Sequence, residues 1–423
     1  MVSQRQRIPG LDGLRAIAIL SVIACHVNSE FGARLPPGHI NHWISVISGA
    51  GWTGVDLFFV LSGFLITGIL YRTKESENFY QNFYIRRALR IFPLFYAYAI
   101  AIMVVPVVLS ATGNSALTFW AHGRRLDRLS VLAYFYNFRA ASLGHHLPLV
   151  NHFWSLAVEE HFYLVWPLLV LRFRRKILMR ICLAGCCGSL LLRLALMNSP
   201  RGLFAAYLLT PCRLDGLMLG AWLALASLDD AVWIKIRRSA PYVATIVAAG
   251  VLAIAVNRGH FYDFIAPGAP NDSRPVVSVG ITLISLLFAA TLAAVVSGSR
   301  FTRWLDTPLL RRIGLYSYGM YLYHMCVIVM LRRSNLLNGI SEARSKLILC
   351  VVVAVATFAI AAVSYHVWEQ PFLRLKSRYE TRQQPEGAVN WSSTSDLLLL
   401  QRKIASSGAP PVASPAPSDE IVR

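Results

Sequence analysis

Long apolar runs, separated by short segments rich in arginine, divide this sequence along most of its length. A helix needs about 20 apolar residues to cross the roughly 30 Å hydrocarbon core of a bilayer. Ten runs reach or approach that length, at residues 11–29, 50–71, 90–110, 152–171, 177–197, 205–225, 241–257, 276–298, 313–332 and 346–369. Only 15% of the residues are charged, against about 25% in a soluble globular domain. The sequence therefore predicts an all-α integral membrane protein, with about ten transmembrane helices in one bundle.

The chain is strongly basic, with 41 lysine and arginine residues, 21 acidic residues and a net charge of +20. In a soluble protein this balance would suggest nucleic acid. Here the cations are more numerous in the loops that share a side of the membrane with the two termini, and the positive-inside rule assigns that side to the cytoplasm. We therefore predict two cytoplasmic termini, contact with the lipid bilayer and no nucleic-acid partner. A short apolar run at 129–138 leaves one alternative, because an eleventh span there would reverse every later segment.

The first predicted span carries two ionisable side chains, Arg15 and His26, eleven residues apart. This separation is close to three helical turns and about 16.5 Å of rise, so both side chains lie on one helix face. Such a face suits a ligand with an anionic head and a distant reactive group, because arginine binds phosphate and neutral imidazole acts as a general base. In the alternative interpretation, Arg15 reaches lipid headgroups and His26 hydrogen-bonds a neighbouring carbonyl group.

Other predicted spans contain acidic and histidine side chains, which are costly in a bilayer unless they are paired or functional. Asp56 requires a partner that the sequence does not identify. Glu159 and Glu160 are adjacent and cannot both face lipid, so we predict that Glu160 orients an imidazole or takes a proton. His324 ends a polar stripe on its helix and is interpreted either as a substrate contact or as a hydrogen-bonded core residue.

Four further arginines are candidates for binding a phosphorylated ligand. Arg87 and Arg90 are three residues apart, which places them on one helix face, and Arg86 precedes them directly. We predict a phosphate clamp there, with ordinary positive-inside charge and contact with anionic lipid as the alternative. Arg213 lies in a later span beside Asp215 and is assigned to the same ligand.

No metal site is predicted. The seven cysteines lie within apolar runs and none is spaced with histidine as metal ligands are, so they are interpreted as core residues. The sequence also lacks a nucleophile elbow, a phosphate-binding Walker loop and a dinucleotide-binding glycine motif.

Seven strings occur in order along the chain: LDGLRAIAILSVIACH, GVDLFFVLSGFLIT, RRALRIFPLFY, FWSLAVEEHFYLVWP, RLDGLMLGAWLA, SYGMYLYH and WEQPFLRLK. Together they resemble the membrane-bound acyltransferase-3 family over about residues 7–376. The resemblance implies an acyl-CoA donor that enters from the cytoplasm. It also implies that His26 is the essential histidine with Arg15 as its partner, and that Arg87 and Arg90 lie near the phosphates of coenzyme A.

This family implies a bacterial cytoplasmic (inner) membrane O-acyltransferase. Acetyl-CoA would be the donor substrate, no cofactor would be bound permanently, and the acceptor would be a sugar hydroxyl of a surface polysaccharide or exopolysaccharide, or of its lipid-linked precursor. The assigned catalytic residues are His26, Glu160, Asp56 and His324. A macrolide or lipid acceptor is one alternative, and a proton-coupled transporter is another from a different class.

The predicted domains are an acyltransferase transmembrane domain at 1–376 and a disordered cytoplasmic tail at 377–423. The tail is rich in serine, alanine and proline and cannot form an apolar core. Because no second domain follows the last predicted span in the printed sequence, two-domain peptidoglycan-modifying members are disfavoured. The acyl group is then expected to pass directly to the acceptor or to a partner acyl-accepting protein.

Overall fold

The computed structural model describes residues 8–31, 46–110, 124–147, 149–199, 201–258, 274–333 and 342–379. Contacts divide the chain into one unit at Pro9–Gln383 and a second formed by Met1–Ile8 with Gln384–Arg423. Everything described below belongs to the first unit. The predicted tail beyond residue 379 lies outside the described residues.

All regular elements in the described part of the chain are helical. The first half contains α1 (Leu11–Phe31), η1 (Ala50–Thr53), α3 (Gly54–Arg72), α4 (Phe79–Ser110), α6 (Arg125–Leu132), α7 (Tyr136–Leu143), α8 (Phe153–Arg172) and α9 (Arg175–Leu196). The second half contains α10 (Gly202–Leu208), η3 (Thr210–Cys212), α11 (Leu214–Ala226), α12 (Asp230–Arg258), η5 (Val276–Gly280), α13 (Ile281–Val296), α14 (Arg300–Leu305), α15 (Pro308–Arg333), α16 (Glu342–Ser364), η6 (Tyr365–Glu369), α17 (Gln370–Leu375) and η7 (Lys376–Tyr379).

Seven helical segments of the described chain are long and apolar enough to cross a membrane, which confirms a multi-pass all-α membrane protein. They are Leu11–Phe31, Val46–Arg72, Phe79–Val104, Arg175–Leu196, Val276–Val296, Pro308–Arg332 and Leu347–Leu375. The predicted number of about ten exceeds these seven. The remaining predicted spans fall on α8, on α12 and on the segment from α10 to α11.

Two predicted segments fold differently from a continuous span. The run at 205–225 is broken into α10, η3 and α11, because Leu209 is extended and Pro211 starts a new helical turn. The run at 129–138 falls on α6 and α7, which have eight residues each. A helix of that length rises about 12 Å and cannot cross a bilayer.

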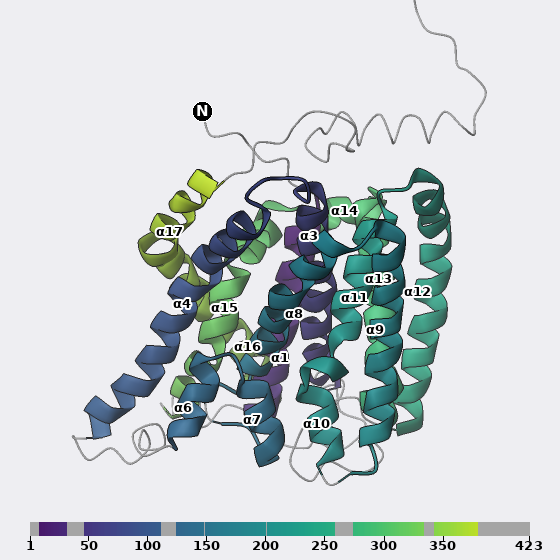
Figure 1. Cartoon of the computed structure of the whole chain (residues 1–423). Coiled ribbons are helices and arrows are strands. Elements are labelled where there is room, and N and C mark those ends of the chain that lie inside the picture. Colours follow the sequence, from purple (N-terminus) through teal and green to yellow (C-terminus); the bar gives the residue numbers. More distant parts are fainter. Residues whose placement is uncertain are drawn as a thin grey trace, which may run out of the picture. The chain divides into compact units, whose positions relative to one another are not determined.

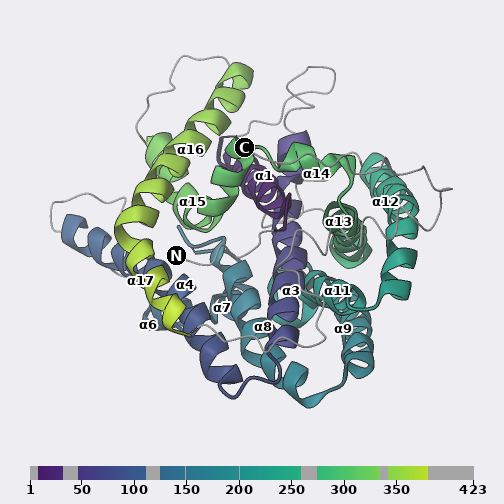
Figure 2. The same ribbon diagram turned by 90° about the horizontal axis from the view of Figure 1, so that it is seen from above.

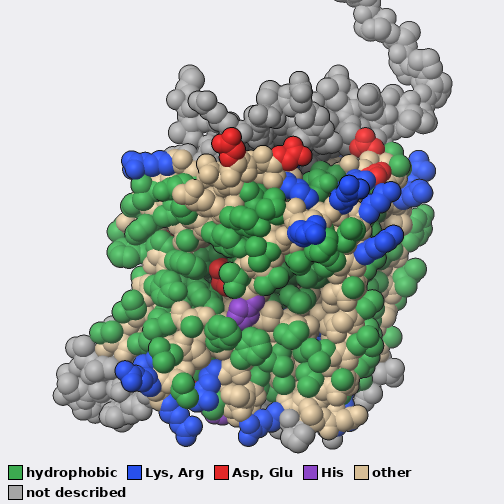
Figure 3. Space-filling model, in the orientation of Figure 1, with side chains coloured by type: hydrophobic (Ala, Val, Ile, Leu, Met, Phe, Trp, Pro, Cys, Tyr) green, Lys and Arg blue, Asp and Glu red, His purple; other side chains and the backbone are tan. Residues whose placement is uncertain are grey.

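The bundle is organised around α1. This helix packs against α15, α3 and α16, while α3 packs on α11 and α11 packs on α9 (Figure 2). The short helices α6, α7 and α10 lie at one end of the bundle and α14 lies at the other (Figure 1). Lysine and arginine side chains gather at both ends, with a hydrophobic band between them (Figure 3). This distribution is the one expected of a protein that spans a bilayer.

Glycine allows the closest helix contact in the core, between α3 and α11. A Cβ atom built on Gly63 would lie 1.9 Å from the carbonyl oxygen of Leu217. One built on Gly220 would lie 2.0 Å from the carbonyl oxygen of Val60. The two backbones therefore touch at two levels, as small residues permit in membrane helices.

We expect Gly63→Ala to separate α3 from α11 and to destabilise the fold by about 1–3 kcal/mol, the usual cost of overpacking. Thermal unfolding of the detergent-solubilised protein measures this effect. Gly188→Ala is the matched control, because its added methyl group would meet nothing within 4 Å. Equal unfolding temperatures for the two variants would contradict the contact.

Candidate functional site

Three histidines from three helices meet near the end of α1. The rings of His26 and His324 have centroids 4.9 Å apart, and His324 Nε2 lies 3.3 Å from His26 Nδ1. The ring of His152, at the start of α8, lies 4.8 Å from that of His324. His324 and His152 are fully buried, whereas His26 is half-buried. His26 and His324, which are both predicted to be catalytic, are therefore in contact.

Hydrogen bonds between α8 and α15 fix this histidine cluster. The Tyr321 hydroxyl donates to the His152 carbonyl oxygen over 3.0 Å and is also hydrogen-bonded to the Ser155 hydroxyl. The Tyr321 carbonyl oxygen in turn accepts a hydrogen bond from His324 Nδ1, at 2.7 Å. His152 Nε2 is buried and has no hydrogen-bond partner among the described residues. The Tyr321 and Ser155 hydroxyl groups therefore lie beside the cluster.

A fourth histidine, His146, belongs to the connection between α7 and α8 and lies within electrostatic range of His26. Burial lowers the pKa of His146 to about 4, with the neighbouring histidines as a smaller cause. Its Nδ1 atom is 3.3 Å from the Tyr136 hydroxyl. His146 is therefore neutral at ordinary pH. Sequence reasoning could not select His146, because a histidine in a loop has no periodic spacing that would indicate its contacts.

A second cluster, toward the start of α1, is formed by three arginines. Arg90 is within electrostatic range of both Arg15 and Arg87. The Arg87 guanidinium lies over the ring of Tyr163, 3.9 Å from its centroid. Arg87 Nε is buried and has no hydrogen-bond partner within the described ranges. Arg86 lies on the same helix turn of α4 and is half-buried.

Carboxylates surround this arginine cluster, which we define as Arg15, Arg87 and Arg90. Glu159 and Glu160 act electrostatically on Arg87, and Glu369 acts on Arg90. Arg15 forms an ion pair of 2.9 Å with Asp12, one turn earlier on α1. A hollow on one face of the bundle shows acidic and histidine side chains at mid-height (Figure 3). The cluster thus holds cations close together in the bundle, where an anionic ligand would be attracted.

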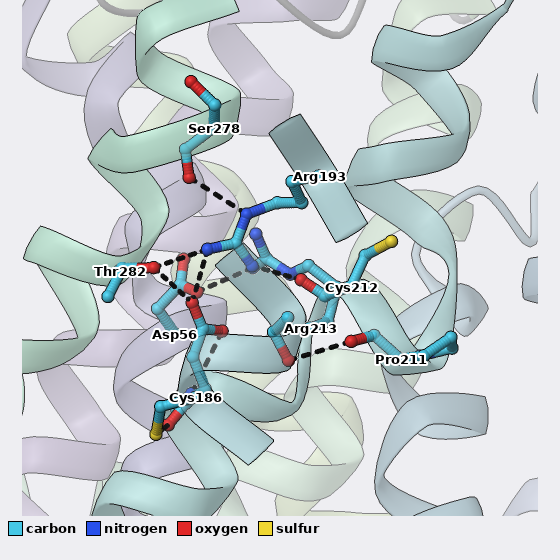
Figure 4. Close-up of polar contacts among 11 residues, drawn as sticks. Asp56, Cys186, Arg193, Pro211, Cys212, Arg213, Ser278 and Thr282 are labelled. Atoms are coloured by element: carbon cyan, nitrogen blue, oxygen red, sulfur yellow. Dashed lines mark hydrogen bonds and ion pairs between the residues drawn. The ribbon is translucent and has the colours of Figure 1, made fainter. Parts of the chain in front are cut away.

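The structure places Asp56 and Arg213 in a third group, within a buried network that joins α3, α9, α11 and α13 with the short elements η3 and η5 (Figure 4). Arg213 Nη2 donates to Asp56 Oδ1 at 2.7 Å, and Arg193 Nη2 donates to Asp215 Oδ2 at 2.8 Å. All four side chains are buried. Arg193 also donates to the backbone carbonyl oxygens of residues 212 and 278. Arg213 was a candidate for binding a phosphorylated ligand, but its recorded ion pair is with a carboxylate of the protein.

Aromatic rings enclose the Arg213 guanidinium. Its carbon atom lies 4.9 Å from the ring centroid of Tyr207, 5.3 Å from that of Trp154 and 5.8 Å from that of Phe59. Such contacts stabilise a desolvated cation through the ring quadrupole. Arg213 Nε and Nη1 and Asp56 Oδ2 have no hydrogen-bond partner among the described residues. The pair therefore lies in a buried aromatic core, and we interpret it as structural.

Among the described residues, neither Glu160 nor Asp56 is hydrogen-bonded to His26, and the carboxylate that acts electrostatically on His26 is Glu30 of the same helix. The recorded hydrogen-bond partners of His26 Nδ1 are the Val22 carbonyl oxygen, at 3.0 Å, and His324. Asp56 is held by Arg213, while Glu160 acts on Arg87. The reason is the helix packing, which inserts the α15 histidine between α1 and α8. Glu160 and Asp56 therefore belong to the surroundings of the arginine cluster and to the buried network, respectively.

Within the described ranges, no three His, Cys, Asp or Glu side chains are grouped as metal ligands would be. The three rings of the histidine cluster pack at 4.8–4.9 Å between centroids, and two of the three Nδ1 atoms point to backbone carbonyl oxygens. These nitrogen atoms donate hydrogen bonds in this arrangement.

Comparison with known proteins identifies the family. The acyltransferase domain family matches residues 8–366, which is most of the chain. This chain belongs to that family. A Bacillus subtilis protein provisionally named a peptidoglycan O-acetyltransferase is 31% identical over 86% of this chain and 54% of its own length. No solved structure matches the chain.

Two further relatives carry related names. The peptidoglycan O-acetyltransferase of Listeria monocytogenes is 29% identical over 87% of this chain and 56% of its own length. A Staphylococcus aureus protein provisionally named an O-acetyltransferase is 28% identical over 92% of this chain and 59% of its own length. The chain thus spans little more than half the length of these relatives. The expectation that peptidoglycan-modifying members are disfavoured is not supported, because named relatives are of that kind.

We expect Asp56→Asn to leave the buried Arg213 cation without its counter-charge and to destabilise the protein by about 3–5 kcal/mol, the usual result of breaking a buried ion pair. Thermal unfolding in detergent measures the loss. Asp229→Asn is the matched control, since Asp229 pairs with Arg175 at a more exposed position, where solvent screens the pair and its loss costs little. A loss in the control as large as in Asp56→Asn would refute the structural role of the buried pair.

Proposed function

We propose that this protein is a membrane O-acetyltransferase that transfers an acetyl group from acetyl-CoA to a sugar hydroxyl. One observation carries the proposal: α1 brings Arg15 to the arginine cluster and His26 to the histidine cluster, within one helical bundle. The two side chains are separated by about 16.5 Å along the helix axis. A donor whose anionic head is distant from its thioester fits this arrangement. Its head would bind at the arginine cluster while its thioester lies near the base.

The arginine cluster supports the choice of donor. Arginine binds phosphate through paired N–H groups, and two neighbouring arginines of α4 lie with Arg15 where phosphates of coenzyme A would be held. Like charges at short range repel each other, so a bound polyanion would relieve the repulsion among the three cations. Acetyl-CoA is consumed as a substrate in this proposal, and the reaction requires no permanently bound cofactor.

The histidine cluster supplies the chemistry. In the proposed step, His26 takes the proton of the acceptor hydroxyl as the hydroxyl oxygen attacks the thioester carbonyl carbon. The C–S bond then breaks, the new C–O ester bond remains, and the proton passes from His26 to the departing thiolate. Transfer through an acyl-imidazole on His26 is the alternative route. The Tyr321 and Ser155 hydroxyl groups beside the cluster are proposed donors for the oxyanion, which either group can reach only by rotating its O–H away from the His152 carbonyl oxygen.

The acceptor is proposed to be a glycan of the cell surface. The names of two relatives make a peptidoglycan sugar the first acceptor to test, and an exopolysaccharide or its lipid-linked precursor the second. An unseen partner protein that receives the acyl group is compatible with the same donor chemistry. Family membership favours acyl transfer over the transporter interpretation, and nothing observed in the bundle favours a macrolide or lipid acceptor.

We expect purified protein in detergent to release coenzyme A from radiolabelled acetyl-CoA and to acetylate peptidoglycan fragments. His26→Ala should abolish transfer because it removes the base, and Arg87→Gln should raise KM for acetyl-CoA by at least tenfold because it removes a charged contact. His145→Ala and Arg172→Gln are the controls, since both residues are exposed and outside the two clusters. Transfer by His26→Ala at the parental rate would exclude the proposed base.

We also propose that the protein lies in the bacterial cytoplasmic membrane with both termini in the cytoplasm, so that acetyl-CoA reaches the arginine cluster directly. The excess of cations on that side supports this orientation. A fluorescent protein that folds only in the cytoplasm, fused to the C-terminus, should be bright. An exported alkaline phosphatase at the same position should be inactive, and an active phosphatase fusion would reverse the orientation.

A further inference from the structure

Two hydrogen bonds to backbone carbonyl groups determine which ring nitrogens carry protons in the histidine pair. His26 Nδ1 lies 3.0 Å from the Val22 carbonyl oxygen, and His324 Nδ1 lies 2.7 Å from the Tyr321 carbonyl oxygen. A carbonyl oxygen only accepts hydrogen bonds, so both Nδ1 atoms must donate. Each neutral imidazole carries one proton, and the Nε2 atom of each ring is therefore a lone-pair acceptor.

This assignment explains the contact between the two rings. His324 Nε2 lies 3.3 Å from His26 Nδ1, so a lone pair faces an N–H group. The His26 N–H is then shared between the Val22 carbonyl oxygen and His324. The second nitrogen of His26, Nε2, takes part in neither hydrogen bond. The same tautomer that satisfies the contacts leaves that atom with a free lone pair.

We infer that His324 is the positioning partner of His26: its Nε2 lone pair receives the His26 Nδ1–H group and so directs His26 Nε2 toward the reacting hydroxyl. In catalytic triads a carboxylate has this place next to the histidine base. Here neither Asp56 nor Glu160 contacts His26 in the described structure, and a neutral imidazole occupies the position instead. The reaction assigned to the pair rests on the proposed function, whereas the contact between the two rings does not.

The surroundings of His324 hold its ring in the required orientation. His324 is fully buried, and its Nδ1–H is fixed by the Tyr321 carbonyl oxygen on its own helix. The ring packs against His152, and Tyr321 is tied to α8 through the His152 carbonyl oxygen and Ser155. Rotation of the ring by half a turn would break the bond to Tyr321. The lone pair on Nε2 is therefore presented to α1 by the packing of α15 on α8.

During transfer, His26 Nε2 gains the proton of the acceptor hydroxyl while its Nδ1 keeps its own. The imidazolium then has two N–H groups, and Nδ1–H donates a stronger hydrogen bond to His324 because the donor is charged. The C–O ester bond forms, the C–S bond breaks, and the thiolate takes the proton from Nε2. His324 neither gains nor loses a proton in this sequence. It stabilises the intermediate imidazolium without competing for the proton of the substrate.

Solid-state NMR of the full chain, labelled with ¹⁵N histidine, tests the tautomer directly. The difference between the parental spectrum and that of His26→Ala identifies the His26 signals. We expect a protonated Nδ1 and an unprotonated Nε2 at neutral pH, the reverse of the tautomer that free histidine favours in water. A protonated Nε2 on neutral His26 would overturn the inference, whether or not acetyl transfer is observed.

Three substitutions of His324 then test its role. The side-chain carbonyl oxygen of glutamine lies close to the position of histidine Nε2, whereas the side chain of asparagine ends near the position of Nδ1. We expect His324→Gln to retain kcat within about fivefold, and His324→Leu and His324→Asn to lower it by about 10- to 100-fold. KM for acetyl-CoA should be unchanged in all three, since the arginine cluster is untouched.

The unfolding temperature of each variant is measured alongside, because a loss of fold would lower activity without any loss of the hydrogen bond. Equal activity of the Leu and Gln variants, with equal unfolding temperatures, would overturn the role of His324. If the parental protein transfers no acetyl group, the proposed function fails, but the NMR result still decides the state of the histidine pair. The two failures are therefore distinguishable.

Discussion

The low dielectric constant of a membrane bundle is the constraint on which the rest of this structure depends. A charge without a partner is costly there, so the packing of the helices must bring opposite charges together. Asp56 on α3 meets Arg213 at the start of α11, and Asp215 meets Arg193 of α9. These two pairs fix how α3, α9 and α11 face one another. The helices on the other side of α1 can then hold an arginine cluster whose charges are only partly balanced.

Seven of the ten predicted spans coincide with helical segments long and apolar enough to cross a membrane, because length and hydropathy are local properties. That Arg15 and His26 share one face of α1 was also predictable, since their eleven-residue spacing is close to three helical turns. The break at 205–225 was not predicted, because the apolar run continues through Pro211 and a hydropathy window does not respond to one proline. The run at 129–138 was ambiguous because hydropathy alone does not show where a helix ends. The two eight-residue helices of the structure resolve it.

The partners of the candidate residues depend on contacts between segments that are distant in the sequence. Arg213 lies 157 residues from Asp56, and His324 lies 298 residues from His26. No single-sequence pattern reports such pairs. The types of residue in the site were predictable because ionisable groups are rare in membrane spans. The separation of those residues into an arginine cluster, a histidine cluster and a buried structural network was not, because it follows from the packing of α1 on α3 and α15 and of α3 on α8 and α11.

A neutral partner for His26 has a physical advantage at this depth in the bundle. A buried carboxylate next to an imidazole favours the protonated ring, and a protonated ring cannot take a proton from a hydroxyl. Histidine at position 324 orients the base through the same type of contact but adds no charge to the bundle. The carboxylates of α8 are free to act on Arg87, where they partly balance the cations. The arginine cluster thus supplies the cations that would bind an anion, and the contact between His26 and His324 adds no fixed charge where a proton must move.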